Sequence, residues 1–506
     1  MPSPLRPAPP RTTPLPATFT LAEDPGTRTF DGGTVLLGGS PLRLLRLSER
    51  ARRLVDRWRD GAPVGPGRAA QQLARRLVSA GAFTPQPMPN ESSMTPPTTS
   101  ADAVTVVIPV RDRPAELDRL LGRIGNLPCI VVDDASADPG RIKEITESHG
   151  ATYRGLTSNV GPARARNEGL DAATTPLIAF IDSDCIPDEG WLGPLLGHFD
   201  DPLVAAVAPR IITAQPDRLG AARSSLDRGE RAGPVRPGSA IPFVPSAALV
   251  VRADLAEGTE LFDPALRGGE DVDLVWRLVE AGWDVRYDPS SAVIHDGPST
   301  LGAFLGRRAF YGTTAGPLSR RHGQALAPVH VAGWSLLVWG LLLARRPVLA
   351  CTALAASIVL LARRLVGLVR DPVDVATRIV GGGTARAAVP ALSSLTRAWG
   401  PAFVLGLLFR RTRRASALAL LIPAVYDSAT QRRTENPLPA VAVHVADDVA
   451  YGAGVWLGCA RARTLVPLIP RVSWRARAWS APSLRDELQT RSRQQPHPQQ
   501  GATDTA

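Results

Sequence analysis

Leu177-Ile178-Ala179-Phe180-Ile181 is a short, continuously apolar stretch that runs directly into Asp182-Ser183-Asp184. Such a run predicts a strand buried on both faces of a sheet. Ligands of open α/β sheets bind beyond the carboxyl ends of the strands, where these two carboxylates would emerge. Carboxylate oxygens suit magnesium or manganese, which can in turn hold a diphosphate. The alternative is an acidic turn without a ligand, since Asp and Ser favour turns.

The residues before this strand alternate between strand and helix patterns. Residues 104–110 and 129–132 are β-branched or apolar runs typical of strands. Between them, residues 114–124 carry leucines at helical spacing. This alternation predicts an α/β domain with a mostly parallel sheet and right-handed crossovers. The second strand ends at Asp133 and Asp134, so Asp134 is expected to share a crevice with Asp182 and Asp184. No G-x-G-x-x-G follows the first strand, which argues against a dinucleotide cofactor.

Several motifs, in this order along the chain, resemble family-two inverting glycosyltransferases. The donor-side matches are Val-Val-Ile-Pro-Val-Arg-Asp at 106–112, Val-Val-Asp-Asp-Ala-Ser at 131–136, Asn-x-Gly-x-x-x-Ala-Arg-Asn-x-Gly at 159–169 and Asp-Ser-Asp at 182–184. Gly-Gly-Glu-Asp-Val-Asp-Leu-Val-Trp-Arg-Leu at 268–278 resembles the acceptor-side motif. The match covers roughly residues 102 to 300 and implies a nucleotide-sugar fold of the GT-A type. One departure is Glu260-Leu261-Phe262-Asp263, where the family commonly has Gly-Gly-Phe-Asp.

The resemblance implies a role for each matching residue. Asp134 would hold the nucleotide base, and the wider nucleotide-sugar site would comprise Pro109, Arg111, Asp133, Asp134, Asn159, Gly161, Arg166 and Asp182. A divalent metal, Mn²⁺ or Mg²⁺, would be bound by Asp182, Asp184 and His295. Asp271 would be the general base, with Glu270 beside it. The chemistry is consistent, because an inverting transfer needs one base for the acceptor hydroxyl and a metal for the leaving diphosphate.

Each of these motifs also has a purely structural interpretation. The acidic run from Glu270 to Asp273 would suit the first turn of a helix by interacting with its dipole. His295, after the strand-like residues 291–294, would be a structural histidine. The segment that begins at Asn159 would be an ordinary turn, with Arg166 and Asn167 facing solvent.

Two further stretches, residues 30–47 and 295–322, resemble a narrower group, the glycosyltransferases of mycofactocin biosynthesis. Mycofactocin is a peptide-derived redox cofactor of actinobacteria. This resemblance implies UDP-glucose as donor, the tyramine-derived premycofactocin as acceptor and a short β-1,4-linked glucose chain as product. The alternatives are transfer to a polyprenyl phosphate or cell-wall glycan and, in another class, a non-catalytic peptide-binding membrane scaffold. No Q-x-x-R-W signature is present, which disfavours a long polysaccharide product.

Composition limits the partners and the compartment. The 506 residues carry a net charge of +11, and Lys143 is the only lysine. We find no nucleic-acid motif, and the arginines flank apolar stretches, so the expected partner is a membrane surface rather than nucleic acid. The four cysteines form no C-x-x-C pair, which argues against a zinc site or a disulfide framework and suits the cytosol. The expected location is the cytoplasmic side of the cell membrane.

The chain is predicted to divide into six parts. These are a disordered segment at 1–17, a small winged-helix-like domain at 18–85, a linker at 86–101, the transferase domain at 102–322, a helical apolar region at 323–480 and a disordered tail at 481–506. The small domain would either dock a peptide or pathway protein or simply brace the transferase. The apolar helices would span the membrane, lie in its interface or pack as a soluble bundle; membrane association is the prediction.

Overall fold

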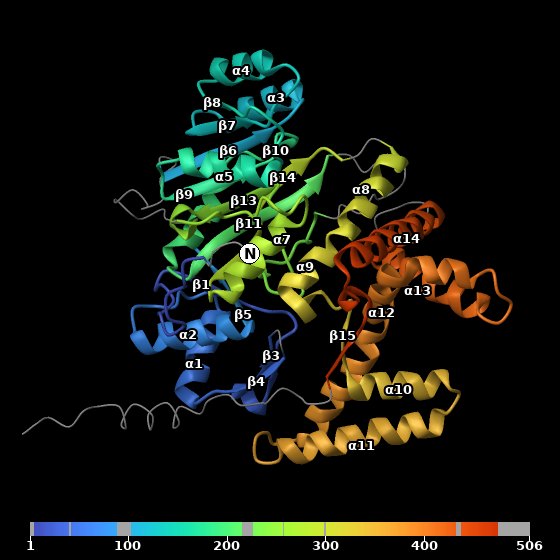
Figure 1. The fold of residues 1–506 in the computed structure, drawn as a ribbon. Coiled ribbons are helices and arrows are strands. Elements are labelled where there is room, and N and C mark those ends of the chain that lie inside the picture. Colours follow the sequence, from blue (N-terminus) through green and yellow to red (C-terminus); the bar gives the residue numbers. More distant parts are fainter. Residues whose placement is uncertain are drawn as a thin grey trace, which may run out of the picture.

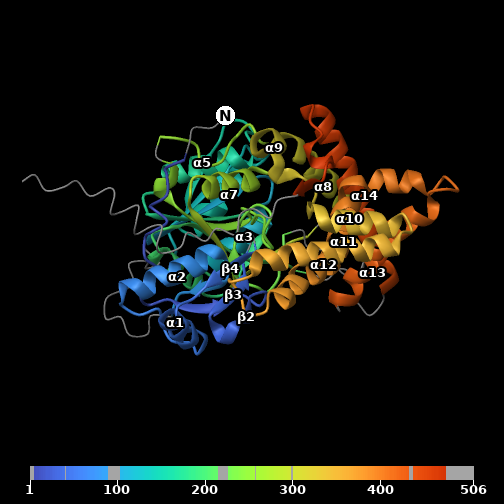
Figure 2. The same cartoon turned by 90° about the horizontal axis from the view of Figure 1, so that it is seen from below.

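A computed structural model of the chain describes residues 5–39, 42–88, 103–214, 226–256, 258–297, 300–431 and 437–473. Figure 1 shows a small N-terminal domain, a central α/β domain and a helical C-terminal region. Figure 2 shows the helical region beside the other two domains rather than around them. The predicted tail at 481–506 and most of the predicted linker lie outside the described residues.

The central domain is built on a nine-stranded sheet with the order β10-β14-β11-β13-β9-β6-β7-β8, and β12 pairs with β14. Its strands are β6 (Val104–Val110), β7 (Cys129–Asp133), β8 (Thr152–Gly155), β9 (Leu177–Ile181), β10 (Cys185–Pro187), β11 (Val204–Thr213), β12 (Gly233–Pro234), β13 (Ala248–Arg252) and β14 (Asp284–His295). Strands β9, β6 and β7 are parallel, as predicted, and β8, which the sequence analysis did not identify, continues the parallel arrangement. Strand β13 runs antiparallel to both β9 and β11. The three predicted strands of the donor half are confirmed.

Helices cover both faces of this sheet. They are α3 (Pro114–Ile124), α4 (Pro139–Ser148), α5 (Pro162–Ala172), α6 (Leu192–Leu196) and α7 (Glu270–Glu280). Alternation along β6 assigns its side chains to two cores, because successive residues of a strand point to opposite faces. Val106 packs in the core that contains Leu117 of α3, whereas Val107 packs in the core that contains Ala163 of α5 and Leu274 of α7. Strand β7 ends at Asp133, directly before Asp134, and β9 ends directly before Asp182, so acidic residues lie at the carboxyl ends of these parallel strands.

The first described residues contradict the prediction of a disordered segment at 1–17, because Leu5 and Ala8 lie against the central α/β domain and Leu15 packs in the core of the N-terminal domain. The Ala8 N–H donates to the Ala281 carbonyl at 3.1 Å, and Trp283 Nε1 donates to the Arg6 carbonyl at 2.7 Å. Apart from a turn in which the Thr13 N–H donates to the Pro10 carbonyl at 2.8 Å, this Pro-rich segment is irregular, so its other polar groups remain available for another surface. Composition alone therefore misled the prediction for this segment.

The N-terminal domain combines small sheets with two helices. Its elements are β1 (Thr20–Glu23), β2 (Arg28–Phe30), β3 (Val35–Gly38), β4 (Arg43–Arg46), α1 (Glu49–Arg59), α2 (Arg68–Ala80) and β5 (Phe83–Gln86). The Ser48 hydroxyl accepts from the Ala51 N–H and caps α1, and Gly81 ends α2 with a φ of +77°, both as the sequence indicates. The fully buried Trp58 lies at the centre of the core.

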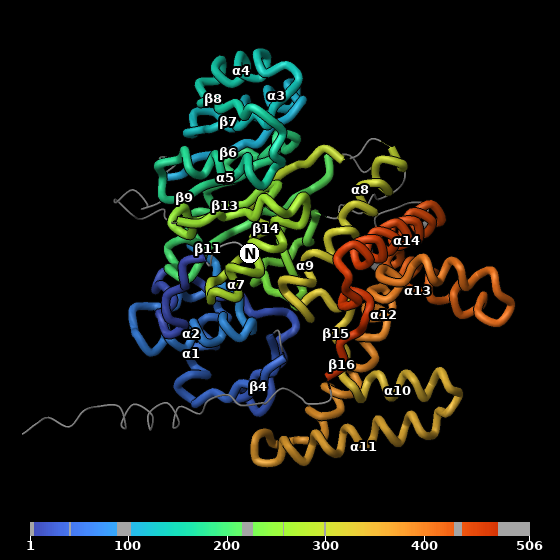
Figure 3. Tube along the Cα trace, in the orientation of Figure 1, coloured from blue at the N-terminus to red at the C-terminus, as the bar shows by residue number. Residues whose placement is uncertain are grey.

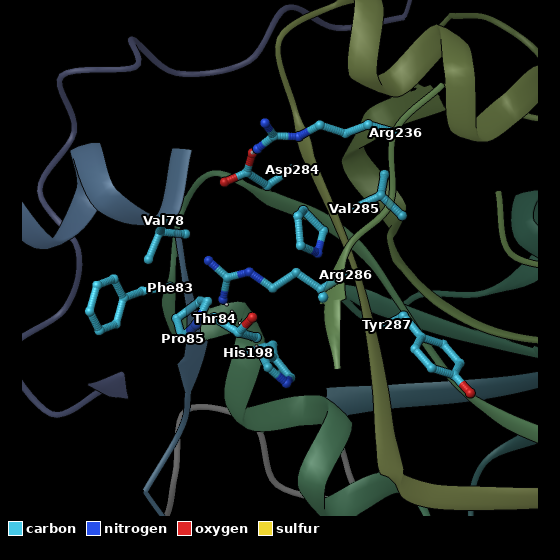
Figure 4. A pocket seen from close by; sticks show the side chains of 12 residues that line it. Val78, Phe83, Thr84, Pro85, His198, Arg236, Asp284, Val285, Arg286 and Tyr287 are labelled. Atoms are coloured by element: carbon cyan, nitrogen blue, oxygen red, sulfur yellow. Dashed lines mark hydrogen bonds and ion pairs between the residues drawn. The ribbon is translucent and has the colours of Figure 1, made fainter. Parts of the chain in front are cut away.

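A buried ion cluster joins this domain to the transferase. Arg75 of α2 and Arg286 of β14 both bind Asp201, and all three side chains are almost fully buried. Figure 4 shows Arg286 beside His198 and, across the same small cavity, Phe83 and Val78 of the N-terminal domain. Removal of one partner from such a cluster leaves an uncompensated buried charge, which costs about 3–5 kcal/mol. The domain therefore braces the transferase, and its docking of a peptide stays a prediction.

The C-terminal region is helical, as predicted for residues 323–480, and it also includes two helices from within the predicted transferase domain at 102–322. Its elements are α8 (Leu301–Thr313), α9 (Ala315–His322), β15 (His330–Ala332), α10 (Gly333–Leu343), α11 (Pro347–Leu365), α12 (Pro372–Gly406), α13 (Arg413–Gln431), α14 (Pro437–Ala462) and β16 (Arg471–Ser473). Among the described residues, α11 is the one helix long and apolar enough to cross a membrane by length and composition. Figure 3 shows α10 and α11 as neighbouring rods at the edge of the molecule.

Glycines bring α14 close to α8 and α9. A Cβ on Gly458 would lie 2.2 Å from the Thr313 carbonyl oxygen, and one on Gly312 would lie 2.1 Å from the Tyr451 carbonyl oxygen. Only glycine permits two backbones to approach this closely. The position of α8 therefore depends on α14.

Gly458→Val is expected to destabilise the protein by about 1–3 kcal/mol or more, because the new side chain must separate α14 from α8. The matched control is Gly383→Val in α12, where a Cβ would meet no atom within 4 Å. Thermal unfolding of both variants checks the prediction. Equal melting temperatures would show that the close contact is not needed.

Candidate active site

The Asp-Ser-Asp motif follows β9 at the carboxyl end of the parallel strands, as predicted. The Asp182 N–H donates to the Ala247 carbonyl at 2.9 Å and so fixes the start of the turn. Strand β10 then pairs with β14, with Cys185 opposite His295. This register places His295 Nε2 3.6 Å from Asp184 Oδ2. The structure therefore brings together Asp184 and His295, which are 111 residues apart in the sequence.

Arg166 connects the donor-side and acceptor-side motifs. Its side chain is buried on α5, where Nη2 donates to Asp182 Oδ1 at 2.6 Å and Nη1 donates to Glu270 Oε1 at 3.1 Å. Its guanidinium also lies over the Phe262 ring, 5.4 Å from the ring centre. The interpretation of Arg166 as a solvent-facing residue is wrong. One guanidinium thus holds a carboxylate of the Asp-Ser-Asp motif next to a carboxylate of the acceptor-side motif.

Asn167, the next residue, anchors the loop where the sequence departs from the family pattern. Its Nδ2 donates to the Phe262 carbonyl at 2.7 Å, and the Phe262 N–H donates to its Oδ1 at 3.0 Å. The Phe262 ring packs edge-on against Phe180 of β9. Leu261 and Phe262 are fully buried. The loop is therefore held firmly although it lacks the two glycines.

Asp134 accepts hydrogen bonds from the N–H groups of Val160 and Gly161, at 2.7 and 2.9 Å. These bonds hold the turn that contains the exposed Asn159 and begins α5, and Gly161 has a φ of +91° that favours glycine. Asp134, Asn159 and Gly161 therefore lie together, as the prediction of one nucleotide-sugar site requires.

Asp133 lies below this turn and is buried. It accepts from the Ser136 N–H at 3.0 Å and from the Tyr153 hydroxyl at 3.0 Å, so both of its oxygens bind groups of the protein. Pro109 lies within β6, and the half-exposed Arg111 follows that strand beside Asp112. The contacts of these residues with a nucleotide stay predictions.

The predicted metal ligands are only partly assembled. Asp184 lies beside His295, whereas Asp182 binds Arg166, and Arg113 forms an ion pair with Asp184. Within the described part of the chain, no group of three His, Cys, Asp or Glu side chains is arranged to hold a metal ion. The donor set of two carboxylates and one imidazole nevertheless suits a divalent ion such as Mn²⁺. The chemistry of these residues therefore fits a metal, and the three ligands stay a prediction.

Asp271 has the environment of a general base. It lies in the first turn of α7, after Gly269 with a φ of +77°, and its Oδ1 accepts from the Val272 N–H at 2.8 Å. Burial and the neighbouring charge of Glu270 raise the pKa of Asp271 to about 7. A carboxylate with this pKa can take a proton efficiently near neutral pH.

The third acid of this run, Asp273, is structural. It contacts Arg277, Arg321 and His322. Burial opposes its ionisation, but hydrogen bonds from His322 and Arg277 and the nearby positive charges lower the pKa of Asp273 to about 2. Asp273 therefore binds basic groups of the protein, whereas Glu270 contacts Arg166 of the donor-side motif.

Glu270→Gln is expected to move the acidic limb of the kcat/KM profile to lower pH, because it removes a charge that raises the pKa of Asp271. Only the ionised form of Asp271 accepts a proton, so wild-type activity should rise with pH up to about 7. The control, Glu280→Gln, removes an exposed acid of the same helix. A profile of the Glu270 variant that coincides with wild type would contradict the coupling.

Sequence reasoning missed two residues that shape this site. Arg113 binds Asp184, and burial together with the charges of Asp271 and Asp182 raises the pKa of Tyr311 of α8. Arg113 is only two residues after the matched Arg111. Both lie in a loop, where the spacing of residues in the sequence does not predict the direction of a side chain. Tyr311 lies within the stretch 295–322 that resembles the mycofactocin glycosyltransferases, but that resemblance gave it no role.

Comparisons with known proteins agree with this geometry. A family model described as "Glycosyl transferase family 2" matches residues 105–258. The "Pre-mycofactocin glycosyltransferase" of Mycobacterium tuberculosis (strain H37Rv) is 39% identical over 479 residues, which cover 90% of this chain and 98% of that protein. The chain belongs to the pre-mycofactocin glycosyltransferase family. It is a nucleotide-sugar-dependent glycosyltransferase with a GT-A fold.

Solved structures show more distant likeness. The mannosyltransferase PcManGT from Pyrobaculum calidifontis, solved with GDP-Man and Mn²⁺, is 19% identical, with a TM-score of 0.36 over 67% of this chain and 92% of that chain. GalNAc-T7, solved with UDP, GalNAc and Mn²⁺, is 16% identical, with a TM-score of 0.33 over 42% of this chain and 50% of that chain.

Proposed function

We propose that the protein transfers glucose from UDP-glucose to premycofactocin with inversion at the anomeric carbon and builds a short β-1,4-linked chain. The name of the two mycobacterial relatives, "Pre-mycofactocin glycosyltransferase", supports premycofactocin as the acceptor. The observation that carries the transfer is the double contact of Arg166 with Asp182 and Glu270, because it joins the donor-side and base-side carboxylates in one site. A binding scaffold without catalysis would not need this arrangement.

In the proposed reaction, Asp271 accepts the proton of the attacking acceptor hydroxyl. The hydroxyl oxygen forms a bond to the anomeric carbon while the bond from that carbon to the diphosphate oxygen breaks. Arg166 keeps Asp182 and Glu270 in place, and Glu270 tunes the pKa of Asp271. A divalent ion bound by Asp182, Asp184 and His295 would supply positive charge to the leaving diphosphate.

We also propose that the helical region associates with the cytoplasmic face of the membrane. Leu343 and Val348, on either side of the turn between α10 and α11, are 85% and 74% exposed to solvent. Arg345 and Arg346 lie between them. Exposed apolar side chains beside arginines suit an interface with anionic lipids. Flotation of the full chain with anionic vesicles, compared with neutral vesicles, tests this proposal.

A panel of nucleotide sugars with Mn²⁺ tests the proposed reaction. Hexose mass gain on premycofactocin with UDP-glucose, abolished by a chelator, is the expected result. Diphosphate release without mass gain on that acceptor would favour the polyprenyl phosphate or cell-wall alternative, which the apolar helices suit. No consumption of any donor would contradict the transferase proposal.

A further inference from the structure

Two basic residues at the end of α9, Arg321 and His322, contact the helix that carries Asp271. We call these two residues the α9 clamp. Figures 1 and 2 both show α9 beside α7. Neither residue has a role in the reaction described above, although both lie in the stretch 295–322 that resembles the mycofactocin glycosyltransferases. The α9 clamp therefore reaches the acceptor-side motif from an element whose function is unassigned.

Arg321 joins α7 to the loop that precedes it. Its Nη2 forms an ion pair with Asp263 of the loop, and its Nη1 donates to Asp273 Oδ1 at 3.2 Å. Arg277 of α7 makes a second connection, because it donates to Asp273 Oδ2 at 2.7 Å and to the Leu261 carbonyl at 2.5 Å. Charged groups thus attach the loop to α7 at two positions.

His322 is held as an imidazolium. Its side chain is 2% exposed, its Nε2 lies 3.1 Å from Asp273 Oδ1, and its Nδ1 lies 3.0 Å from Glu280 Oε1. An ionised carboxylate only accepts hydrogen bonds, so both ring nitrogens must carry a hydrogen to satisfy both contacts. Burial opposes the charge, but the hydrogen bonds to Asp273 and Glu280 outweigh burial and raise the pKa of His322 above its ordinary value. A neutral imidazole would leave one carboxylate facing a nitrogen lone pair.

The charges around His322 balance when its ring is protonated. The charged groups connected to it, directly or through Asp273 and Arg321, are three carboxylates and two guanidiniums: Asp263, Asp273 and Glu280, and Arg277 and Arg321. The Trp276 ring of α7 packs edge-on against the imidazole and carries no charge. The imidazolium supplies the third positive charge. Loss of its proton would therefore leave an uncompensated negative charge on α7, the helix on which Asp271 must itself be ionised.

We propose that the α9 clamp, with His322 protonated, positions Asp271 for proton transfer, and that loss of the His322 proton lowers activity at alkaline pH. Asp273 and Asp271 lie in the same first turn of α7, so contacts that fix Asp273 also fix the direction of Asp271. Arg166 holds Glu270 of the same turn. A displacement of a reacting group by about 1 Å can lower the rate by about 10²-fold. The inference rests on the proposed role of Asp271 as the base.

The direction of the pH dependence follows from the direction of the pKa shift. A group whose pKa is raised by folding contributes stability below its ordinary pKa, here 6.5, and loses that contribution as pH rises through the raised value. Activity should therefore rise with pH as Asp271 ionises and fall again as His322 loses its proton.

Transfer by the full-length protein across a range of pH tests the role of His322. His322→Gln should lower kcat by about 10–100-fold and leave the affinity for UDP close to wild type, because the donor-side residues keep their contacts. His322→Lys keeps a positive charge through this pH range, so it should recover transfer and move the alkaline limb to higher pH. A His322→Lys profile with the wild-type alkaline limb would overturn the proposal.

Glu280→Gln provides a second test if the His322 variants do not fold, since the Glu280 side chain is 59% exposed. Loss of one of the two carboxylates should move the alkaline limb to lower pH and leave the acidic limb in place. An alkaline limb that does not move would also overturn the proposal. The control is His149→Gln, which removes a histidine that pairs with Asp118 at the surface and should keep both limbs.

Thermal unfolding separates the α9 clamp from the reaction. The melting temperature of wild type should exceed that of His322→Gln most below pH 6.5, and the difference should shrink as pH rises. A difference that does not depend on pH would contradict the imidazolium and overturn the proposal. Because unfolding needs no substrate, failure of glucose transfer by wild type would count against the proposed function and leave this measurement valid.

Discussion

Asp271→Asn is expected to lower transfer by about 10²–10⁴-fold, the usual contribution of a general base. The amide has nearly the shape of the carboxylate and can keep the contact with the Val272 N–H, but it cannot accept the acceptor proton. Binding of UDP with Mn²⁺ should therefore remain close to wild type. The experiment measures single-turnover transfer and UDP affinity on the same preparations.

The matched control for this substitution is Asp171→Asn, the same chemical change at an exposed position of α5. It should transfer at the wild-type rate. Wild-type turnover by Asp271→Asn would remove Asp271 from the role of base. Loss of UDP binding in that variant would instead show that Asp271 serves the donor.

Arg166→Gln is expected to destabilise the protein by about 3 kcal/mol and to abolish most of the transfer. Glu270 would be left as a buried carboxylate without its partner, and loss of one side of a buried pair is costly. Asp182 is more exposed and contributes less to this loss. Because the charge of Arg166 lowers the pKa of Asp271, residual activity should show an acidic limb at higher pH than wild type. This shift is opposite to the one expected for Glu270→Gln.

Arg164→Gln is the control, since Arg164 lies on the same helix but pairs with Glu168 and Glu260 at the surface. Exposed pairs of this kind contribute about 0–1 kcal/mol. Urea unfolding and pH-dependent transfer of the two variants should therefore differ clearly. Equal stability and activity would show that the double contact of Arg166 has no role.

The sequence was sufficient for the parts of the site that depend on local pattern. The apolar run at 177–181 predicted a buried strand with acidic residues at its carboxyl end, and the structure confirms both features. The alternating segments before it predicted a mostly parallel sheet, and the three predicted strands, β6, β7 and β9, are parallel in the structure. These features follow from periodicity and from the handedness of crossovers.

Features that depend on contacts between distant residues were not predictable in the same way. Arg166 and Glu270 are 104 residues apart, and helical spacing in α5 did not show which of its arginines is buried. Likewise, the composition of the Pro-rich residues 5–17 gave no sign that they pack against the transferase and N-terminal domains. The partner of a polar group must be known before its burial can be predicted, because burial without a partner is unfavourable.

The linkage of the sugar product tests the central claim most directly. Proton NMR of the product formed from UDP-glucose reports the configuration at the anomeric carbon. A single displacement at the anomeric carbon, assisted by one base, inverts its configuration. The α-linked glucose of UDP-glucose should therefore become β-linked in the product. An α-linked product would contradict the inverting mechanism and the role of Asp271 in it.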